Sequence, residues 1–208
     1  MFGIHDFGVF LATGILLNLT PGQDTMFILG RSVAQGRGAG IASALGISAG
    51  SIIHTFAAAF GLSALLAASS SAFLVIKLAG AAYLVFLGAR MLFARPAAAA
   101  IPANFGSSGF LAVFRQGLLT NVLNPKVALF FLAFMPQFIA TDSPSKFAAF
   151  VALGLCFVTT GALWCLTLAW FSSLLGERLR GNTGFTGVLN RTAGALFVFL
   201  GVRLAATR

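Results

Sequence analysis

The chain has 208 residues, of which 59% are hydrophobic and only 8% are charged, and its mean hydropathy is +0.98. In a soluble domain about a quarter of the residues are charged. This composition therefore excludes a soluble globular protein and indicates a helical integral membrane protein. The net charge of +9 does not indicate nucleic-acid binding, because the Lys and Arg residues are mostly isolated and lie near the ends of apolar segments. At such places they signal membrane topology.

Apolar runs predict an all-α protein with six transmembrane helices. The length accommodates about six spans of ~20 residues with short connections. The first span has neither a basic segment before it nor a small-residue cleavage site after it, so we expect it to be retained rather than cleaved as a signal peptide. The predicted spans are 7–29, 41–67, 72–92, 110–138, 147–175 and 185–206.

The longest polar connection, residues 94–107, is rich in Ala, Pro, Gly and Ser. Such a segment is typical of a linker. It predicts a single transmembrane domain, 1–208, made of two halves at about 1–93 and 108–208.

Two of the six spans are interrupted by polar segments that contain proline. Residues 18–24 (Asn-Leu-Thr-Pro-Gly-Gln-Asp) interrupt the first span, and residues 121–126 (Asn-Val-Leu-Asn-Pro-Lys) interrupt the fourth. Broken helices at membrane depth survive only where protein surrounds them or where they line a wet cavity. Paired breaks in corresponding positions of two halves point to a transporter's binding site. The pattern therefore predicts a small secondary transporter with helices broken at Pro21 and Pro125.

An internal repeat supports the division into halves. Ala81–Arg90 aligns without gaps with Gly194–Arg203, and six of the ten positions are identical. The two proline breaks also correspond, at an offset of 104 residues. Each half holds three spans, an odd number, so the second half must enter the membrane in the opposite orientation. The sequence thus predicts a 3+3 inverted-topology repeat that works by alternating access.

The distribution of Lys and Arg predicts the orientation. The connections after the first, third and fifth spans and their flanks hold eight arginines, against three or four basic residues on the opposite side. This bias predicts that the odd-numbered connections are cytoplasmic and that both termini lie outside, in the periplasm. The eight are Arg31, Arg37, Arg90, Arg95, Arg115, Arg178, Arg180 and Arg191, and the opposing residues are Lys146, Arg203, Arg208 and, at a span end, Lys77.

Several blocks occur in the order of a known family: Leu19–Asp24, Gly46–Gly50 with His54, Lys77–Gly88, Phe114–Lys126 and Met135–Phe138. On these blocks the chain resembles the LysE/RhtB family of bacterial inner-membrane amino-acid exporters. Gln23 stands where the family usually has a second proline. The resemblance implies a compact six-helix fold and proton-driven export of an amino acid or a related small metabolite. It implies no enzymatic reaction, and neither it nor the residues indicate a cofactor or a metal.

The residues of the first break suggest their own roles. Pro21 cannot donate a backbone hydrogen bond, so it frees carbonyls near Leu17, and Gly22 lets the chain turn. We expect Asn18 and Thr20 to supply side-chain partners for the freed groups. This pattern predicts an unwound segment whose backbone contacts the substrate. The alternative interpretation is an ordinary proline kink.

Two charged residues lie next to the breaks. Asp24 is the only acidic residue within an apolar span, and a charge at the bilayer centre costs at least ~2.5 kcal/mol. It is predicted either to bind a substrate ammonium or the coupling proton, or to cap the second half of the first span. Lys126 is predicted to face the same cavity, as a partner for Asp24 or for a substrate carboxylate, unless its stem snorkels to the interface. Together the two charges suit a zwitterion.

His54 and Tyr83 are further candidates within spans, either as hydrogen-bonding core residues or as members of a proton pathway. Lys77 and Arg90 are expected to anchor the third span, and Phe130, Phe131 and Phe134 to pack helices. The candidate substrate- and proton-binding residues are Asn18, Thr20, Pro21, Gly22, Asp24, His54, Tyr83, Asn121, Asn124, Pro125 and Lys126.

Other functions remain open at this point. A membrane thiol oxidoreductase can share the inverted plan, but it needs cysteines on both halves, and Cys156 and Cys165 both lie in the fifth predicted span. A translocator of another solute, such as a cation, fits the same plan. A scaffold protein has no reason to carry polar groups at membrane depth. The small-residue faces at Gly46/Gly50 and Gly194/Gly201 permit a homodimer but equally serve internal packing.

Overall fold

The structure is a computed structural model that describes residues 2–68, 70–93, 108–140, 142–172 and 183–206. These residues are almost entirely helical, and the β-type pairing among them is an isolated bridge between Ile4 and Ile139. The elements are α1 (Phe7–Leu19), α2 (Gln23–Gln35), α3 (Arg37–Ala68), α4 (Ser70–Phe93), α5 (Phe110–Val122), α6 (Pro125–Leu129), the π-helical η1 (Phe130–Phe134), the 3-10 turn η2 (Met135–Phe138), α7 (Lys146–Trp170) and α9 (Thr183–Ala206).

The helices follow the predicted segments, and both breaks lie at the predicted prolines. The first span is divided into α1 and α2 at residues 20–22, and the fourth into α5 and α6 at residues 123–124. The first segment runs to Gln35 rather than ending at residue 29, because the helix continues through polar residues until Gly36, whose φ is +83°. A positive φ is accessible to glycine at little cost and stops the helix there.

Length and composition among the described residues allow two single helices to cross a membrane, Arg37–Leu62 within α3 and Lys146–Trp170. The pair Phe110–Val122 and Pro125–Phe138, bent by 48° at its break, makes a third. Phe7–Leu19 and Leu78–Phe93 are shorter apolar helices. Outside the described residues lie the linker 94–107, the predicted end of the fifth span at 173–175, Arg95, Arg178, Arg180, Arg208 and the side chain of Lys77.

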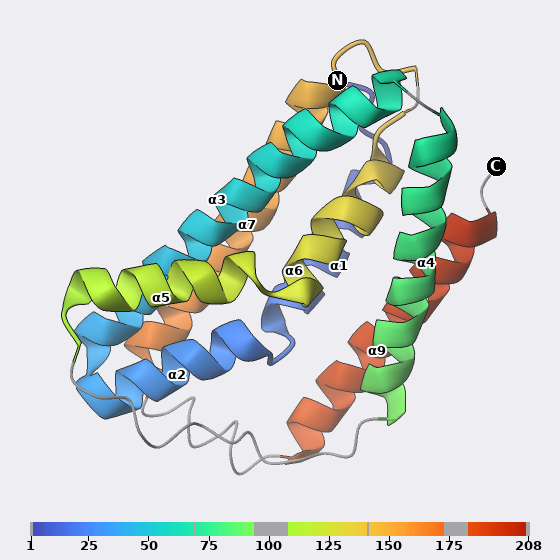
Figure 1. Cartoon of the computed structure of the whole chain (residues 1–208). Helices are drawn as coiled ribbons and strands as arrows, with labels where there is room; N and C mark the ends of the chain where they lie inside the picture. The colour runs from blue at the N-terminus through green and yellow to red at the C-terminus, as the bar shows by residue number, and fades with distance from the viewer. Residues whose placement is uncertain (1, 69, 94–107, 141, 173–182, 207–208) are drawn as a thin grey trace.

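The helices form two antiparallel pairs, and α1, α6 and η1 of the broken segments lie between them (Figure 1). The long helices α3 and α7 lie side by side, and α5 packs against α3. On the other side α4 packs along α9. Helix α1 contacts both α7 and α9, and η1 contacts α4, so the broken segments join the two pairs. Thr20 at the first break and Asn124 at the second are each 4% exposed, whereas the Leu123 side chain at the second break is 75% exposed.

Glycines allow the α4–α9 pair to approach closely. A Cβ on Gly88 would lie 2.6 Å from the Gly194 carbonyl oxygen, and a Cβ on Gly194 would lie 2.7 Å from the Gly88 oxygen. A Cβ on Gly201 would lie 2.8 Å from the Ala81 oxygen. Small residues permit this backbone contact between membrane helices. This small-residue face is thus occupied within the chain.

The same holds for the small-residue face of α3. A Cβ on Gly46 would collide with the Phe114 carbonyl oxygen of α5, and one on Gly50 would lie 2.7 Å from the Asn121 Oδ1 atom. Both faces that the sequence left open to a homodimer therefore serve packing inside the chain.

A cluster of buried aromatic rings fills the space between α1, η1, η2 and α7. Neighbouring ring centroids lie between 4.4 Å (Phe130 and Phe157) and 6.3 Å (Phe10 and Phe134). Each such contact contributes about 0.5–1.5 kcal/mol beyond burial. The packing role expected for Phe130, Phe131 and Phe134 is confirmed: these rings are 2%, 1% and 0% exposed.

Arg31 differs from its sequence-based placement in a connection. It lies within α2 and is only 4% exposed. Its guanidinium donates to Gln35 Oε1 at 2.8 Å and to Gln116 Oε1 of α5. The arginine therefore joins α2 to α5.

Candidate functional site

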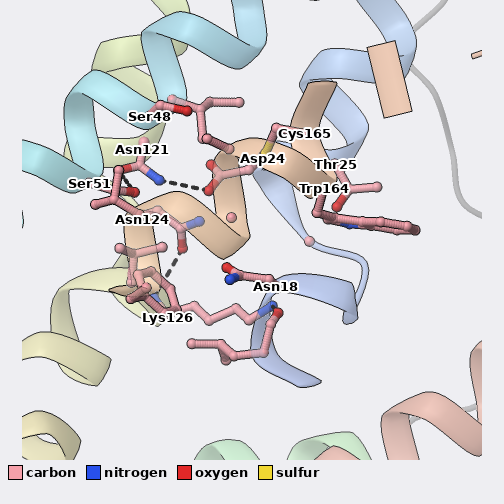
Figure 2. A pocket seen from close by; sticks show the side chains of 18 of the residues that line it. Asn18, Asp24, Thr25, Ser48, Ser51, Asn121, Asn124, Lys126, Trp164 and Cys165 are labelled. Carbon is pink, nitrogen blue, oxygen red and sulfur yellow. Dashed lines mark hydrogen bonds between the residues drawn. The ribbon is translucent and has the colours of Figure 1, made fainter. Parts of the chain in front are cut away.

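A cavity of about 40 Å³ lies beside the two helix breaks (Figure 2). A buried water needs roughly 10–15 Å³, so the cavity has room for a few waters and is far below the ~300–1,000 Å³ of typical ligand pockets. The cavity is therefore too small for an amino acid in this structure. The lining residues are Leu17, Asn18, Thr20, Gly22, Asp24, Thr25, Ile47, Ser48, Ser51, Asn121, Asn124, Lys126, Val127, Phe157, Val158, Gly161, Ala162, Trp164 and Cys165.

At the first break a lysine from the second break replaces the missing proline donor. Pro21 has no N–H, so the Leu17 carbonyl loses its helical partner, as the sequence predicted. Lys126 Nζ donates to Leu17 O at 2.8 Å and to Thr20 O at 2.9 Å. Thr20 Oγ1 donates to the neighbouring carbonyl of Leu16 at 2.6 Å. The C-terminal end of α1 is thus satisfied by a side chain 106 to 109 residues away in sequence.

Asn18 does not supply a partner to the break, contrary to expectation. Its Nδ2 atom donates to Thr160 Oγ1 of α7 at 3.2 Å, and its side chain lies beside Gly161. The residue sits in the last turn of α1 on the face that meets α7, so its amide is directed across that helix contact. It still lines the cavity.

At the second break a histidine of α3 contacts the carbonyl that the proline frees, as Lys126 does at the first break. Pro125 leaves Asn121 O without its helical donor, and this oxygen accepts from Asn124 N at 3.0 Å. His54 Nε2 lies 3.2 Å from the same oxygen, and since a carbonyl only accepts, Nε2 carries the proton in this contact. Asn124 Oδ1 accepts from Lys126 N at 3.0 Å and caps α6.

Asp24 is not a helix cap. The N-cap of α2 is Gly22, and Asp24 is the second residue of that helix. Its Oδ2 atom accepts from Asn121 Nδ2 at 2.8 Å (Figure 2). Its Oδ1 atom is buried and has no hydrogen-bond partner among the described residues. One oxygen of this carboxylate is therefore held by Asn121, and the other makes no hydrogen bond within the described residues.

Asp24 and Lys126 line one cavity but do not form an ion pair with each other in the described part of the chain. Each is held by neutral groups instead: an amide for the carboxylate and two carbonyls for the ammonium. An acid and a base that line one small cavity without a direct ion pair can receive the two opposite charges of a zwitterion.

The opposite wall of the cavity is apolar. It is formed by α7, which contributes Phe157, Val158, Ala162, Trp164 and Cys165, and this helix places no charged side chain on the cavity. The chain's two cysteines are both free and both lie on α7, so no cysteine pair joins the two halves.

Some predicted site residues do not reach the cavity. Tyr83 lies on α4, where its ring contacts Phe86 at 6.0 Å. His54 stacks on Phe131 and binds the second break from outside the cavity, and the two prolines shape the breaks without lining it.

Sequence reasoning missed several lining residues: Thr25, Ser48, Ser51, Trp164 and Cys165. Ser48 and Ser51 carried the signal that identified His54, a polar residue inside an apolar span. Trp164 carried none, although its Nε1 donor is buried and has no partner among the described residues.

The chain is similar in sequence to known membrane proteins. A family model described as "LysE type translocator" matches residues 15–208. The leucine efflux protein of Salmonella choleraesuis (strain SC-B67) is 28% identical over 204 residues, 98% of this chain and 96% of that protein. The uncharacterised membrane protein YrhP of Bacillus subtilis (strain 168) is 29% identical over 96% of this chain and 98% of its own.

An uncharacterised membrane protein of Vibrio cholerae is 30% identical over 99% of this chain and 98% of its own length. No solved structure matches the chain. The family model covers nearly the whole sequence, including both helix breaks. The chain is therefore a membrane transporter rather than an enzyme, and it belongs to the family of LysE type translocators.

Proposed function

We propose that this protein exports an amino acid with an apolar side chain across the bacterial inner membrane, using the proton gradient. The observation that carries the proposal is the cavity between the two breaks, where the free Asp24 oxygen and the Lys126 ammonium face one space. Intramembrane charges of this kind mark substrate and ion pathways.

The two charged residues bind the two charged groups of the substrate. The substrate ammonium binds Asp24 Oδ1, which lacks a partner among the described residues. The substrate carboxylate binds Lys126, whose ammonium has three N–H donors and spends two on neutral carbonyls. A carboxylate is a stronger acceptor for an ammonium than a carbonyl is. Asn18 and Asn124 add polar groups beside this end of the cavity.

The wall formed by α7 receives the substrate side chain. A charged side chain would lose its hydration against Phe157 and Val158, and the wall offers a cationic side chain no acceptor from these two residues or from Trp164, whose indole N–H only donates. An aliphatic side chain is favoured by the same wall. The relative named a leucine efflux protein supports leucine as the first compound to test.

Two sets of contacts support the inverted repeat. In the alignment of Ala81–Arg90 with Gly194–Arg203, Gly88 corresponds to Gly201 and Ala81 to Gly194. The contact of Gly88 with Gly194 therefore corresponds to the contact of Gly201 with Ala81, and both are present. A pair of helices related by a two-fold axis has this reciprocal pattern.

The second set lies at the breaks. Asn121 of the fourth segment packs on Gly50 of α3 and bonds to Ser51. Asn18 of the first segment packs on Gly161 of α7 and bonds to Thr160. Each break thus holds the middle helix of the other half through an asparagine. Rocking of the halves about this centre gives alternating access.

Asp24 also suits the coupling proton. After the ammonium leaves towards the outside, a proton from that side neutralises the buried carboxylate and removes the cost of its charge during the return step. Substrate and proton then occupy Asp24 in turn, which drives exchange of one for the other.

The export of leucine can be tested directly. Cells that produce the protein are loaded with a leucine-containing dipeptide, and leucine in the medium is measured beside lysine- and glutamate-containing dipeptides. We expect leucine to leave several times faster than from cells without the protein, and the charged amino acids to leave at the background rate. A proton uncoupler is expected to abolish efflux against a gradient. No accelerated efflux of any amino acid would contradict the function, and efflux unaffected by the uncoupler would contradict the coupling.

Both termini are proposed to lie in the periplasm. In support, the N-terminal segment, the connection after η2 and the end of α9 meet at one end of the protein: His5 N bonds to Phe138 O at 3.0 Å, and Arg203 pairs with Asp6 at 3.2 Å. A reporter active only in the periplasm, fused to the C-terminus, should be active, whereas one active only in the cytoplasm should be silent. The reverse pattern would contradict the topology.

A further inference from the structure

Asn121 is fixed from three directions by α3. Ser51 Oγ donates to its Oδ1 atom at 3.2 Å, His54 Nε2 binds its backbone oxygen at 3.2 Å, and Gly50 lies directly against its side chain. The residue is only 1% exposed. Its side chain therefore has one arrangement available.

This arrangement determines what Asn121 offers to Asp24. An amide oxygen cannot donate a hydrogen bond, so the amide NH₂ group faces the carboxylate and Oδ1 faces the Ser51 hydroxyl. Asn121 Nδ2 therefore donates to Asp24 Oδ2, at 2.8 Å. The second carboxylate oxygen of Asp24, Asp24 Oδ1, is buried and has no hydrogen-bond partner among the described residues.

We propose that Ser51 and His54 are positioning residues that act through Asn121 to keep Asp24 Oδ1 directed to the substrate ammonium. The inference rests on the proposed function, because it takes Asp24 as the ammonium site. It goes further in assigning a role to Ser51, which lines the cavity, and to His54, which does not.

The other half makes a similar asparagine contact, although at the repeat offset of 104 residues Asn18 aligns with Val122 and not with Asn121. Asn18 also packs on a glycine and bonds to a hydroxyl of the facing helix. At the repeat offset of 104 residues, however, Asp24 corresponds to Ala128, so the second half has no carboxylate at the matching place. Both halves thus have an asparagine that contacts the facing helix, but only the contact of Asn121 also positions an acid, Asp24.

The test measures how well the transporter discriminates leucine from 4-methylpentanoate, which is leucine without its ammonium group. The full-length protein is reconstituted in vesicles, and both compounds compete with labelled leucine. Wild type should favour leucine strongly. In Ser51→Ala and His54→Leu the KM for leucine should rise about three- to tenfold, as expected for loss of one orienting hydrogen bond. The preference over 4-methylpentanoate should fall by the same factor, with the maximal rate nearly unchanged.

Two further variants separate positioning from folding. Ser43→Ala is the matched control, since Ser43 is a fully buried serine of the same helix whose hydroxyl bonds to its own helix at Ala39 O. It should keep the wild-type discrimination. His54→Gln retains an N–H donor and should recover most of it.

The possible failures are distinguishable. Wild type that transports no leucine would overturn the proposed function and the inference with it. Wild type that discriminates, with Ser51→Ala and His54→Leu that discriminate equally well, would overturn the inference alone. A change of equal size in Ser43→Ala would also overturn it, because the effect would then follow from loss of any buried hydroxyl of α3.

Discussion

Replacing Asp24 by Asn is expected to abolish export while the protein still reaches the membrane. Asparagine keeps the shape of the side chain and an oxygen that can accept from Asn121, so the contact at 2.8 Å and the local fold can persist. It carries no charge and takes up no proton. The variant loses the proposed ion pair between Asp24 and the substrate ammonium. Removing one partner of a buried ion pair costs about 3–5 kcal/mol, which corresponds to at least a 100-fold loss of leucine efflux.

The matched control is Asp6→Asn, the same change at the start of α1. Asp6 is exposed and pairs with Arg203 at 3.2 Å. The hydrogen bond from Arg203, aided by His5, holds the pKa of Asp6 below its usual value, so this acid is ionised at neutral pH. Exposed pairs contribute little to stability, and export by this variant should remain near wild type. Efflux at the wild-type rate in Asp24→Asn would remove this residue from the site.

The sequence predicted those features of the site that depend on local backbone chemistry. Proline lacks a donor wherever it stands, so the freed carbonyl at Leu17 followed from Pro21 alone. The rarity of charge in apolar spans singled out Asp24 and Lys126, and both line the cavity. The capping role offered for Asp24 was wrong, because the helix begins two residues earlier than that role needs, with Gly22 as its N-cap.

What the sequence did not predict were the partners across long distances. Lys126 donates to the carbonyl that Pro21 leaves without a donor. His54 contacts the carbonyl that Pro125 leaves without its helical donor. These contacts depend on how helices distant in sequence pack together, which no local pattern encodes. Trp164 was missed for the same reason: an aromatic residue in an apolar span looks alike whether it meets lipid, core or cavity.

Replacing Lys126 by Met is expected to remove export and stability together. Methionine preserves much of the apolar stem but has no N–H, so Leu17 O and Thr20 O lose the donor that both share. Each buried oxygen left without a partner costs about 1–3 kcal/mol. The purified variant should therefore unfold at a clearly lower temperature than wild type, and its leucine efflux should be at the background rate, because the substrate carboxylate has lost its cation.

Lys146→Met provides the control for removing a lysine. Lys146 begins α7 outside the cavity, and its ammonium lies 3.4 Å from Ser143 O. This variant should match wild type in thermal unfolding and in efflux. Lys126→Arg should separate the two roles of Lys126, since guanidinium keeps the charge and can still donate, although its planar shape suits a carboxylate better than two carbonyls.

The two measurements together decide what Lys126 does. If Lys126→Met lowers the unfolding temperature but exports leucine at the wild-type rate, the lysine serves only the helix break. If both readouts fall and Lys126→Arg recovers leucine efflux more fully than thermal stability, the ammonium has two separate uses. It then bonds to the Leu17 and Thr20 carbonyls when substrate is absent and turns to the carboxylate when substrate binds. Arrival of substrate then releases the first break, which places the start of the conformational change at the point where the chain is least able to form a helix.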